Sequence, residues 1–192
     1  MGGLFASPPI CFLLKSGSFP TEWRLVILQR KMTASRKAAL EKFLARAQRA
    51  AGLAGDVDVL VTSNAGIRSL NRRFRGKDQA TDVLSFLVLA ADHNADATHL
   101  AGDIAISADA ATESAAQFGH SVDQEIKILM LHGILHLAGF DHERDNGVMA
   151  RKEAQLRRAL KLPSALIERG RSGTSSVTKK KRQRHRAGAA TV

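Results

Sequence analysis

The sequence predicts an α/β (α+β) domain, in which a small four-stranded mixed sheet is packed against about five helices. The chain has 192 residues, enough for one domain with tails, and 44% of them are hydrophobic, enough to fill a core. Between residues 23 and 160, strand-like and helix-like segments follow one another in the order β-α-β-α-β-β-α-α-α. This order indicates one sheet with helices packed on it, and no internal domain boundary.

Four segments have the composition of strands. Trp23–Gln29 is apolar and β-branched, and Asp56–Thr62 alternates between polar and apolar residues. Asp82–Ala90 and Gly102–Ser107 are rich in Val, Leu and Ile. A polar link, Ala91–Ala101, separates the last two segments. These four segments are the predicted strands of the sheet.

Five segments are predicted to be helices, because they have apolar residues at helical spacing and residues that favour helix ends. They run from Thr33 or Ser35 to Ala51, from Ser63 or Asn64 to Gly76, from Ser107 or Asp109 to Gly119, from Val122 to about Ala138, and from Glu143 to Leu160. Ser121 and Gln124 form a capping box before the fourth helix. Pro163 ends the last helix.

The charge of the chain divides it into three parts. The net charge is +11, but residues 169–192 carry eight Lys or Arg and no acidic residue, which leaves +3 for residues 1–168. We therefore predict a flexible N-terminal extension over residues 1–22, a single domain over residues 23–165 and a disordered basic tail over residues 166–192. A basic tail of this kind often contacts RNA phosphates, although it also occurs as a solvated terminus.

The cysteine content and the hydropathy pattern indicate the compartment. Cys11 is the single cysteine, so no internal disulfide and no cysteine-rich zinc site is possible. No apolar run approaches the roughly 18–20 residues that a membrane helix needs. We expect a cytoplasmic protein with no membrane partner.

The segment LHGILHLAGFDHE, residues 131–143, contains three histidines. His132 and His136 are four residues apart, so they lie on one face of a helix, about one turn apart. Gly139 can take the left-handed conformation that ends a helix, and the chain can then return with His142 as a third nitrogen ligand. Three protein ligands with an open fourth position are typical of a catalytic zinc site, so we predict one Zn²⁺ per chain.

The same spacing occurs in the metzincin zinc signature, but one position differs. Metzincins have a glutamate directly after the first histidine as the general base, and this chain has Gly133 there. This chain therefore lacks the carboxylate that a metzincin protease uses as its general base. Glu125, two helical turns before His132, is a candidate base or a residue that orients a ligand. Asp141 fits best in the turn.

A group of cations indicates the class of substrate. Arg72, Arg73, Arg75 and Lys77 surround the end of one predicted helix. Arginine suits phosphate because it donates two parallel hydrogen bonds, so these residues are candidate RNA contacts. A solvated basic face is the alternative interpretation. Phe74 lies among them and is expected to pack in the core.

Three blocks of this sequence resemble the YbeY family of bacterial endoribonucleases. HGILHLAGFDH (132–142) is similar to the histidine motif of that family, LNRRFRGKDQATDVLSF (70–86) to its Leu-Asn-x-x-Tyr/Phe-Arg … Thr-Asp-Val-Leu-Ser-Phe block, and GDIAIS (102–107) to its Gly-Asp-Ile-x-Ile-Ser strand. Leu87 replaces the proline that the family usually has after Ser-Phe. The terminal extensions lie outside the resemblance.

The resemblance implies a zincin-like fold with zinc on the three histidines and a functional arginine at Arg75. It also implies a single-stranded RNA substrate, the 3′ end of small-subunit ribosomal RNA, and the small ribosomal subunit as the partner. The sequence thus favours a zinc-dependent endoribonuclease of ribosomal RNA. Two alternatives remain: an RNA-binding ribosome-assembly factor with structural zinc, and a metalloprotease-like hydrolase.

Overall fold

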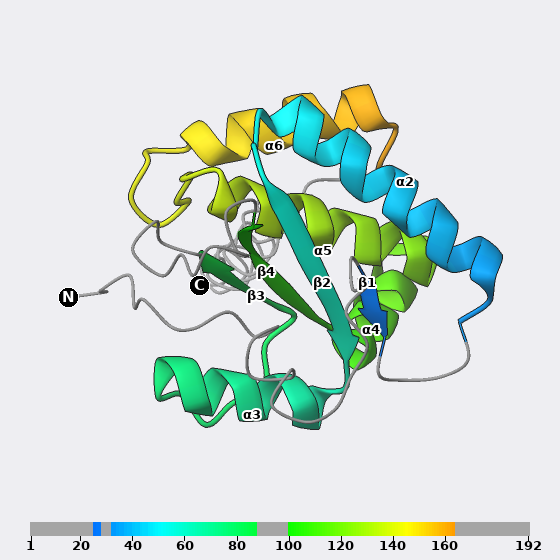
Figure 1. The fold of residues 1–192 in the computed structure, drawn as a ribbon, viewed down its shortest axis with the longest axis vertical. Helices are drawn as coiled ribbons and strands as arrows, with labels where there is room; N and C mark the ends of the chain where they lie inside the picture. Colours follow the sequence, from blue (N-terminus) through cyan, green and yellow to red (C-terminus); the bar gives the residue numbers. More distant parts are fainter. Residues whose placement is uncertain (1–24, 28–31, 88–99, 164–192) are drawn as a thin grey trace, which may run out of the picture.

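The computed structural model describes residues 25–27, 32–87 and 100–163. These residues form an α+β fold with helices on both faces of a mixed sheet (Figure 1). No helix in these ranges is long and apolar enough to cross a membrane. The predicted N-terminal extension, residues 1–22, and the predicted basic tail, residues 166–192, lie outside the described residues.

Two parallel strands form the middle of the sheet, β2 (Asp56–Thr62) and β4 (Leu100–Ser107). The strand β3 (Val83–Leu87) pairs with β4 in the antiparallel direction. The short strand β1 (Leu25–Ile27) pairs with β2 in parallel. The order is β1-β2-β4-β3, so the prediction of a small mixed sheet within an α+β fold is confirmed.

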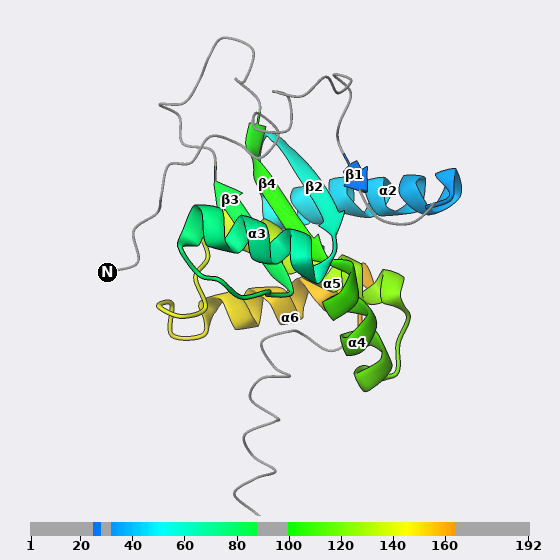
Figure 2. The same ribbon diagram turned by 90° about the horizontal axis from the view of Figure 1, so that it is seen from below.

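The two faces of the sheet bury different sets of apolar residues, because successive strand residues point to opposite sides. Val59 and Ile104 are paired in the register and belong to the larger core, together with most of α5 (Val122–Leu137). Leu60 and Ala105 belong to a smaller core with α3 (Asn64–Arg75). Figure 2 shows α3 crossing the strands on this second face.

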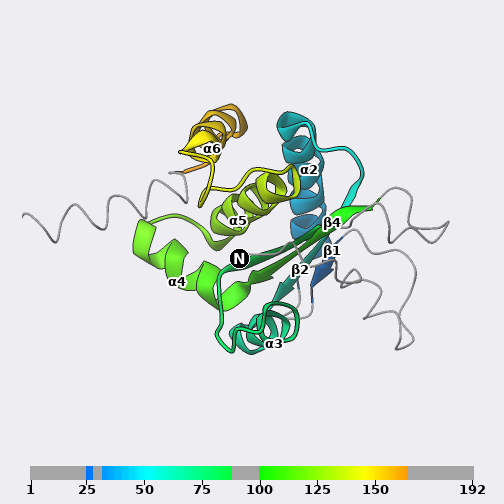
Figure 3. The ribbon, with the colours of Figure 1, turned by 90° about the vertical axis from the view of Figure 1, so that its left-hand side faces the viewer.

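The larger core is covered by several helices. α5 lies against the sheet, and α2 (Ala34–Ala51), α4 (Ala108–Phe118) and α6 (Val148–Leu160) pack against α5 (Figure 3). Eleven of the 16 residues of α5 are buried, so this helix is the centre of the domain. A side chain on α5 is therefore held firmly in place.

At Gly133, α5 comes very close to the sheet. A Cβ atom built on Gly133 would lie 2.8 Å from the Cγ2 atom of Ile104, which is fully buried on β4. The hydroxyl of Ser85 on β3 donates to the carbonyl of Gly133 at 3.4 Å. Only a residue without a side chain fits here, so the neighbouring residue of α5, His132, is fixed beside the sheet.

Four of the five predicted helix starts agree with the capping hydrogen bonds. The N-cap side chains that accept a backbone N–H are Thr33, Ser63, Ser107 and Ser121. The capping box of Ser121 and Gln124 is present, as predicted. Each of these caps depends on residues close in sequence, which explains why sequence patterns could identify them.

Two predicted boundaries are wrong. Others, among them both ends of the first predicted strand at Trp23 and Gln29, lie outside the described residues. The last helix begins at Val148 rather than Glu143, because the Asp145 carboxylate accepts the N–H groups of Gly147 and Met149 and holds the preceding residues in a turn. The predicted polar link ends earlier than expected, since β4 begins at Leu100. The end of the third predicted strand, residues 88–90, is outside the described residues.

Candidate metal centre

Two histidines lie one turn apart near the end of α5. The Nε2 atoms of His132 and His136 are 3.1 Å apart, and the ring centroids are 4.8 Å apart. His132 is buried and His136 is half-buried.

The third histidine comes from that turn. Gly139 has a φ of 89°, the left-handed conformation predicted for it. The N–H groups of Gly139 and Phe140 donate to the carbonyls of His136 and Leu135, which ends the helix. The chain then reverses, and the ring centroid of His142 lies 5.3 Å from those of both other histidines. One nitrogen from each ring lies within 4.8 Å of the others.

Hydrogen bonds at the Nδ1 atoms of His132 and His136 fix the orientation of these two rings. The Nδ1 atom of His136 donates to the carbonyl of Phe140 at 3.0 Å, since a carbonyl oxygen can only accept. The Nδ1 atom of His132 lies 3.1 Å from a carboxylate oxygen of Glu153 and donates to it. In a neutral imidazole with a proton on Nδ1, the Nε2 atom carries a free lone pair.

The two Nε2 lone pairs therefore face each other at 3.1 Å. Burial lowers the pKa of His136 to about 4, and the neighbouring His132 and His142 act in the same direction. His136 is therefore neutral near neutral pH, and its Nε2 lone pair is available to a metal cation.

The geometry fits an ion that prefers imidazole ligands. Two nitrogens bound to one zinc ion at about 2.0–2.1 Å and at a tetrahedral angle are roughly 3.4 Å apart, close to the observed Nε2 separation. The carboxylate and carbonyl behind the rings are the partners that metal-bound histidines usually have. Nickel and copper also accept imidazoles, so the donor set fits several transition metals.

Glu153 was not identified as a site residue from the sequence. Its side chain is fully buried on α6, 21 residues after His132, and its carboxylate contacts the His132 ring. A signal was present, because Glu153 falls on the same helical face as the buried residues Met149 and Leu156. An acidic residue in an apolar stripe needs a buried partner.

The predicted site carboxylate, Glu125, does not lie at the group of His132, His136 and His142. It lies seven residues before His132, about 10 Å along the helix axis. Its carboxylate is buried and lies 2.6 Å from the Nε2 atom of His120. This placement does not support the prediction that Glu125 is the general base, and it indicates a role in joining α4 to α5.

Asp141 lies in the turn, as expected. Its carboxylate accepts the N–H of Glu143, and its carbonyl accepts the N–H groups of Arg144 and Asp145. These hydrogen bonds shape the segment that returns His142 to the other two histidines.

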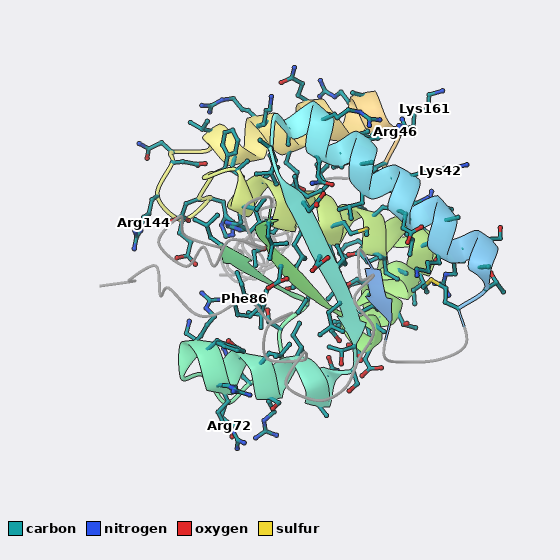
Figure 4. All side chains as sticks on the ribbon, in the orientation of Figure 1. Lys42, Arg46, Arg72, Phe86, Arg144 and Lys161 are labelled. Carbon is teal, nitrogen blue, oxygen red and sulfur yellow. The ribbon has the colours of Figure 1, made fainter. Side chains whose placement is uncertain are left out.

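The predicted cations lie at the end of α3, on the other face of the sheet. Arg72, Arg73, Arg75 and Lys77 are all exposed. Arg72 projects away from the sheet (Figure 4), and the guanidinium of Arg73 lies 5.6 Å from the centre of the Phe74 ring. Phe74 is half-buried against Phe86, so it packs rather than standing free. The described structure shows no hydrogen bond between Arg75 and the three histidines.

The fold and the site define an α+β protein with a candidate metal centre, formed by three histidines at the end of its most buried helix. A family model described as Endoribonuclease YbeY matches residues 22–161. The chain therefore belongs to the YbeY family.

Relatives in this family cover most of the chain. A protein of Koribacter versatilis is 51% identical over 159 residues, which are 83% of this chain and 100% of the relative. One of Solibacter usitatus is 46% identical over 147 residues, 77% of this chain and 95% of the relative. Both are named Endoribonuclease YbeY. The solution structure of TM1509 from Thermotoga maritima is 28% identical, covers 71% of this chain and 88% of its own, and has a TM-score of 0.49.

Proposed function

We propose that this chain is an endoribonuclease that depends on one zinc ion bound by His132, His136 and His142. The observation that carries this proposal is the convergence of three imidazole nitrogens in a chain whose relatives are named endoribonucleases. The proposed substrate is single-stranded RNA at the 3′ end of small-subunit ribosomal RNA. The small ribosomal subunit is the proposed partner, the cytoplasm the proposed location, and the fold is proposed to be zincin-like.

The residues around the histidines have separate roles in the proposed reaction. A bound zinc ion supplies Lewis acidity toward a phosphodiester and toward water. Glu153 and the carbonyl of Phe140 hold two imidazoles in the tautomer that presents Nε2. His142 is exposed, so RNA has access to the group from that side.

Gly133 separates this site from a protease. The position that holds the metzincin glutamate points into the sheet here, against Ile104. A side chain at position 133 would point at Ile104 and not at the histidines, so this position cannot supply the general base of a metzincin. This geometry argues against the metalloprotease alternative.

Arg75 is the proposed phosphate-binding residue of the reaction. It is exposed at the last position of α3, and Gly76 ends the helix directly after it. A guanidinium donates two parallel hydrogen bonds to phosphate and stays charged, so it can neutralise charge that develops on phosphoryl oxygens. Arg72, Arg73 and Lys77 are proposed contacts to the RNA backbone on either side.

Metal analysis combined with RNA cleavage tests the proposal. We expect about one zinc per wild-type chain and cleavage of a ribosomal RNA fragment that chelation abolishes. His132→Ala should lose both the metal and the cleavage. Arg75→Glu should keep the metal and lose about tenfold or more in cleavage, because one charge-stabilising contact is reversed.

The double variant Ala116→Glu with Gln117→Glu is the matched control for charge, since both positions are exposed on α4 and together they change the net charge by the same two units. It should cleave like the wild type. Full cleavage by both His132→Ala and Arg75→Glu contradicts the proposal. Normal ribosome maturation with a folded His132→Ala protein that cuts no RNA would favour the assembly factor instead.

A further inference from the structure

A second group of exposed cations lies on α2 and α6, on the opposite side of the sheet from α3 (Figure 3). We call it the α2–α6 face, and its members are Lys42, Arg46, Arg49, Arg151, Arg158 and Lys161. Figure 4 shows Lys42, Arg46 and Lys161 projecting outward along the same side of the molecule. The two helices pack against each other, so their cations form one surface.

Acidic side chains do not neutralise this face. The acidic residues of α2 and α6 are Glu41 and Glu153. Glu41 pairs with Lys37 at 3.8 Å, and Glu153 is buried against His132. In the part of the chain that the structure describes, none of the six cations forms an ion pair.

The arrangement has a cost to the folded protein. Lys42 and Arg46 are four residues apart on α2, and Arg46 and Arg49 are three apart, so like charges are neighbours on one helix face. Like charges at this spacing destabilise a helix. A polyanion bound on the face would remove this repulsion.

The composition of the face indicates which polyanion it fits. Protein interfaces have an apolar or aromatic centre, and membrane-surface helices insert apolar side chains. Among the described residues, the exposed large hydrophobic side chains are Phe118 on α4 and Val148 at the start of α6, and α2 has none. A surface that offers charge without apolar anchors fits a phosphate backbone.

We propose that the α2–α6 face is a second RNA-binding surface, which holds a double-helical part of a structured RNA while the strand to be cut lies at the histidines. The choice of RNA as the polyanion rests on the proposed function. The phosphates of an RNA duplex are recognised by charge and shape rather than by sequence, so Lys and Arg on two packed helices suffice for this recognition.

A blunt RNA hairpin without a single-stranded tail, whose loop is replaced by a non-nucleotide linker, tests the surface, because it offers no unpaired nucleotides for a single-strand-specific nuclease to cut. The variant combines Lys42→Gln, Arg46→Gln and Lys161→Gln, three exposed positions whose neutralisation leaves the core intact. We expect hairpin affinity of the metal-loaded protein to fall about tenfold or more at 0.1 M salt. The slope of log K against log salt should fall by about 0.9 for each phosphate that the variant no longer neutralises.

The control changes the net charge by the same amount elsewhere. Thr112→Glu, Ala116→Glu and Gln117→Glu are exposed positions on α4, and together they also add three negative units. This control should bind the hairpin within about twofold of the wild type. Cleavage of a short unstructured RNA should be unchanged in both triple variants.

Three results overturn the proposal. The first is wild-type hairpin affinity in the α2–α6 variant, and the second is an equal loss in the α4 control, which would mean that only net charge matters. The third is an α2–α6 variant that keeps its hairpin affinity but no longer binds phosphatidylserine vesicles, which would mean that the face binds a membrane surface rather than RNA.

The binding and cleavage measurements distinguish a failure of the α2–α6 surface from a failure of the proposed nuclease function. If the wild-type protein binds the hairpin through the α2–α6 face but cuts no RNA, the nuclease proposal fails and the surface stands. If it cuts unstructured RNA but does not bind the hairpin, the surface fails and the nuclease proposal stands.

Discussion

At the scale of single residues, Glu153 decides how His132 presents its nitrogen. Its buried carboxylate accepts the Nδ1 proton, so the Nε2 lone pair points toward the other histidines. Partners of this kind orient a metal ligand and raise its basicity. Glu153 therefore acts through His132 and is a positioning residue.

Glu153→Gln tests that role, because the amide keeps the shape of the side chain but removes its charge. We expect zinc affinity, measured by competition with a chromophoric chelator, to fall about 10–100-fold. Glu143→Gln is the control, since Glu143 is exposed on the turn and should have no effect. Unchanged zinc affinity in Glu153→Gln would show that the hydrogen bond is structural only.

His136 gives the metal-free protein a dependence on pH. Its pKa is about 4 in the folded protein, mainly because of burial, against 6.5 in the unfolded chain. As the pH falls, the unfolded chain binds the proton first, so the contribution of His136 to stability is complete above about pH 6.5 and is lost between pH 6.5 and pH 4.

Chemical denaturation of the metal-free protein at several pH values measures this contribution. The wild type should lose more stability between pH 7 and pH 4.5 than His136→Asn does, because the variant has no imidazole at this position to protonate. Parallel pH curves for the two proteins would contradict the low pKa.

At the scale of elements, the packing of α5 on β4 depends on Gly133. We expect Gly133→Ala to lower the free energy of unfolding, because the new Cβ meets Ile104 at 2.8 Å. Overpacking of this kind costs about 1–3 kcal/mol, more than the roughly 1 kcal/mol that alanine gains in helix propensity.

A double-mutant cycle with Ile104→Ala identifies the cause. If the clash with Ile104 is responsible, Gly133→Ala should cost less, or become stabilising, in the Ile104→Ala background. Denaturant unfolding of the four proteins gives the coupling energy. Additive effects of the two substitutions would mean that the close approach of α5 to the sheet is not limited by this pair.

The elements show which structural features local patterns can predict. Thr33, Ser63, Ser107 and Ser121 were recognisable as helix starts because a cap involves residues three positions apart. The turn at Gly139 and the gathering of the histidines also follow from short spacings.

Features that depend on distant residues were not predictable in this way. Glu153 meets His132 through the packing of α6 on α5, and Glu125 is paired with His120 rather than with the histidine group. The late start of α6 depends on the side chain of Asp145, which competes with the helix for backbone N–H groups. The pairing of β2 with β4 likewise joins segments that are far apart in the chain.

At the scale of the whole molecule, metal binding should stabilise the fold, because the unfolded chain does not gather the three ligands. Chelation of the zinc-loaded protein should lower its melting temperature, and added zinc should restore it. Free zinc at 100 times the dissociation constant contributes about 2.7 kcal/mol. His132→Ala should melt at the same temperature with and without zinc, and a zinc-dependent shift in that variant would place the metal elsewhere.

The three histidines differ in burial, and this difference has a kinetic consequence. His132 is buried, His136 is half-buried and His142 is exposed on a turn that hydrogen bonds to Asp141 shape. Opening of this turn frees one ligand without disturbing α5, so an ion can leave while the domain stays folded. We therefore expect this turn to govern how long a metal stays in the proposed site, and substitutions that slow unfolding of the core to leave the rate of metal exchange unchanged.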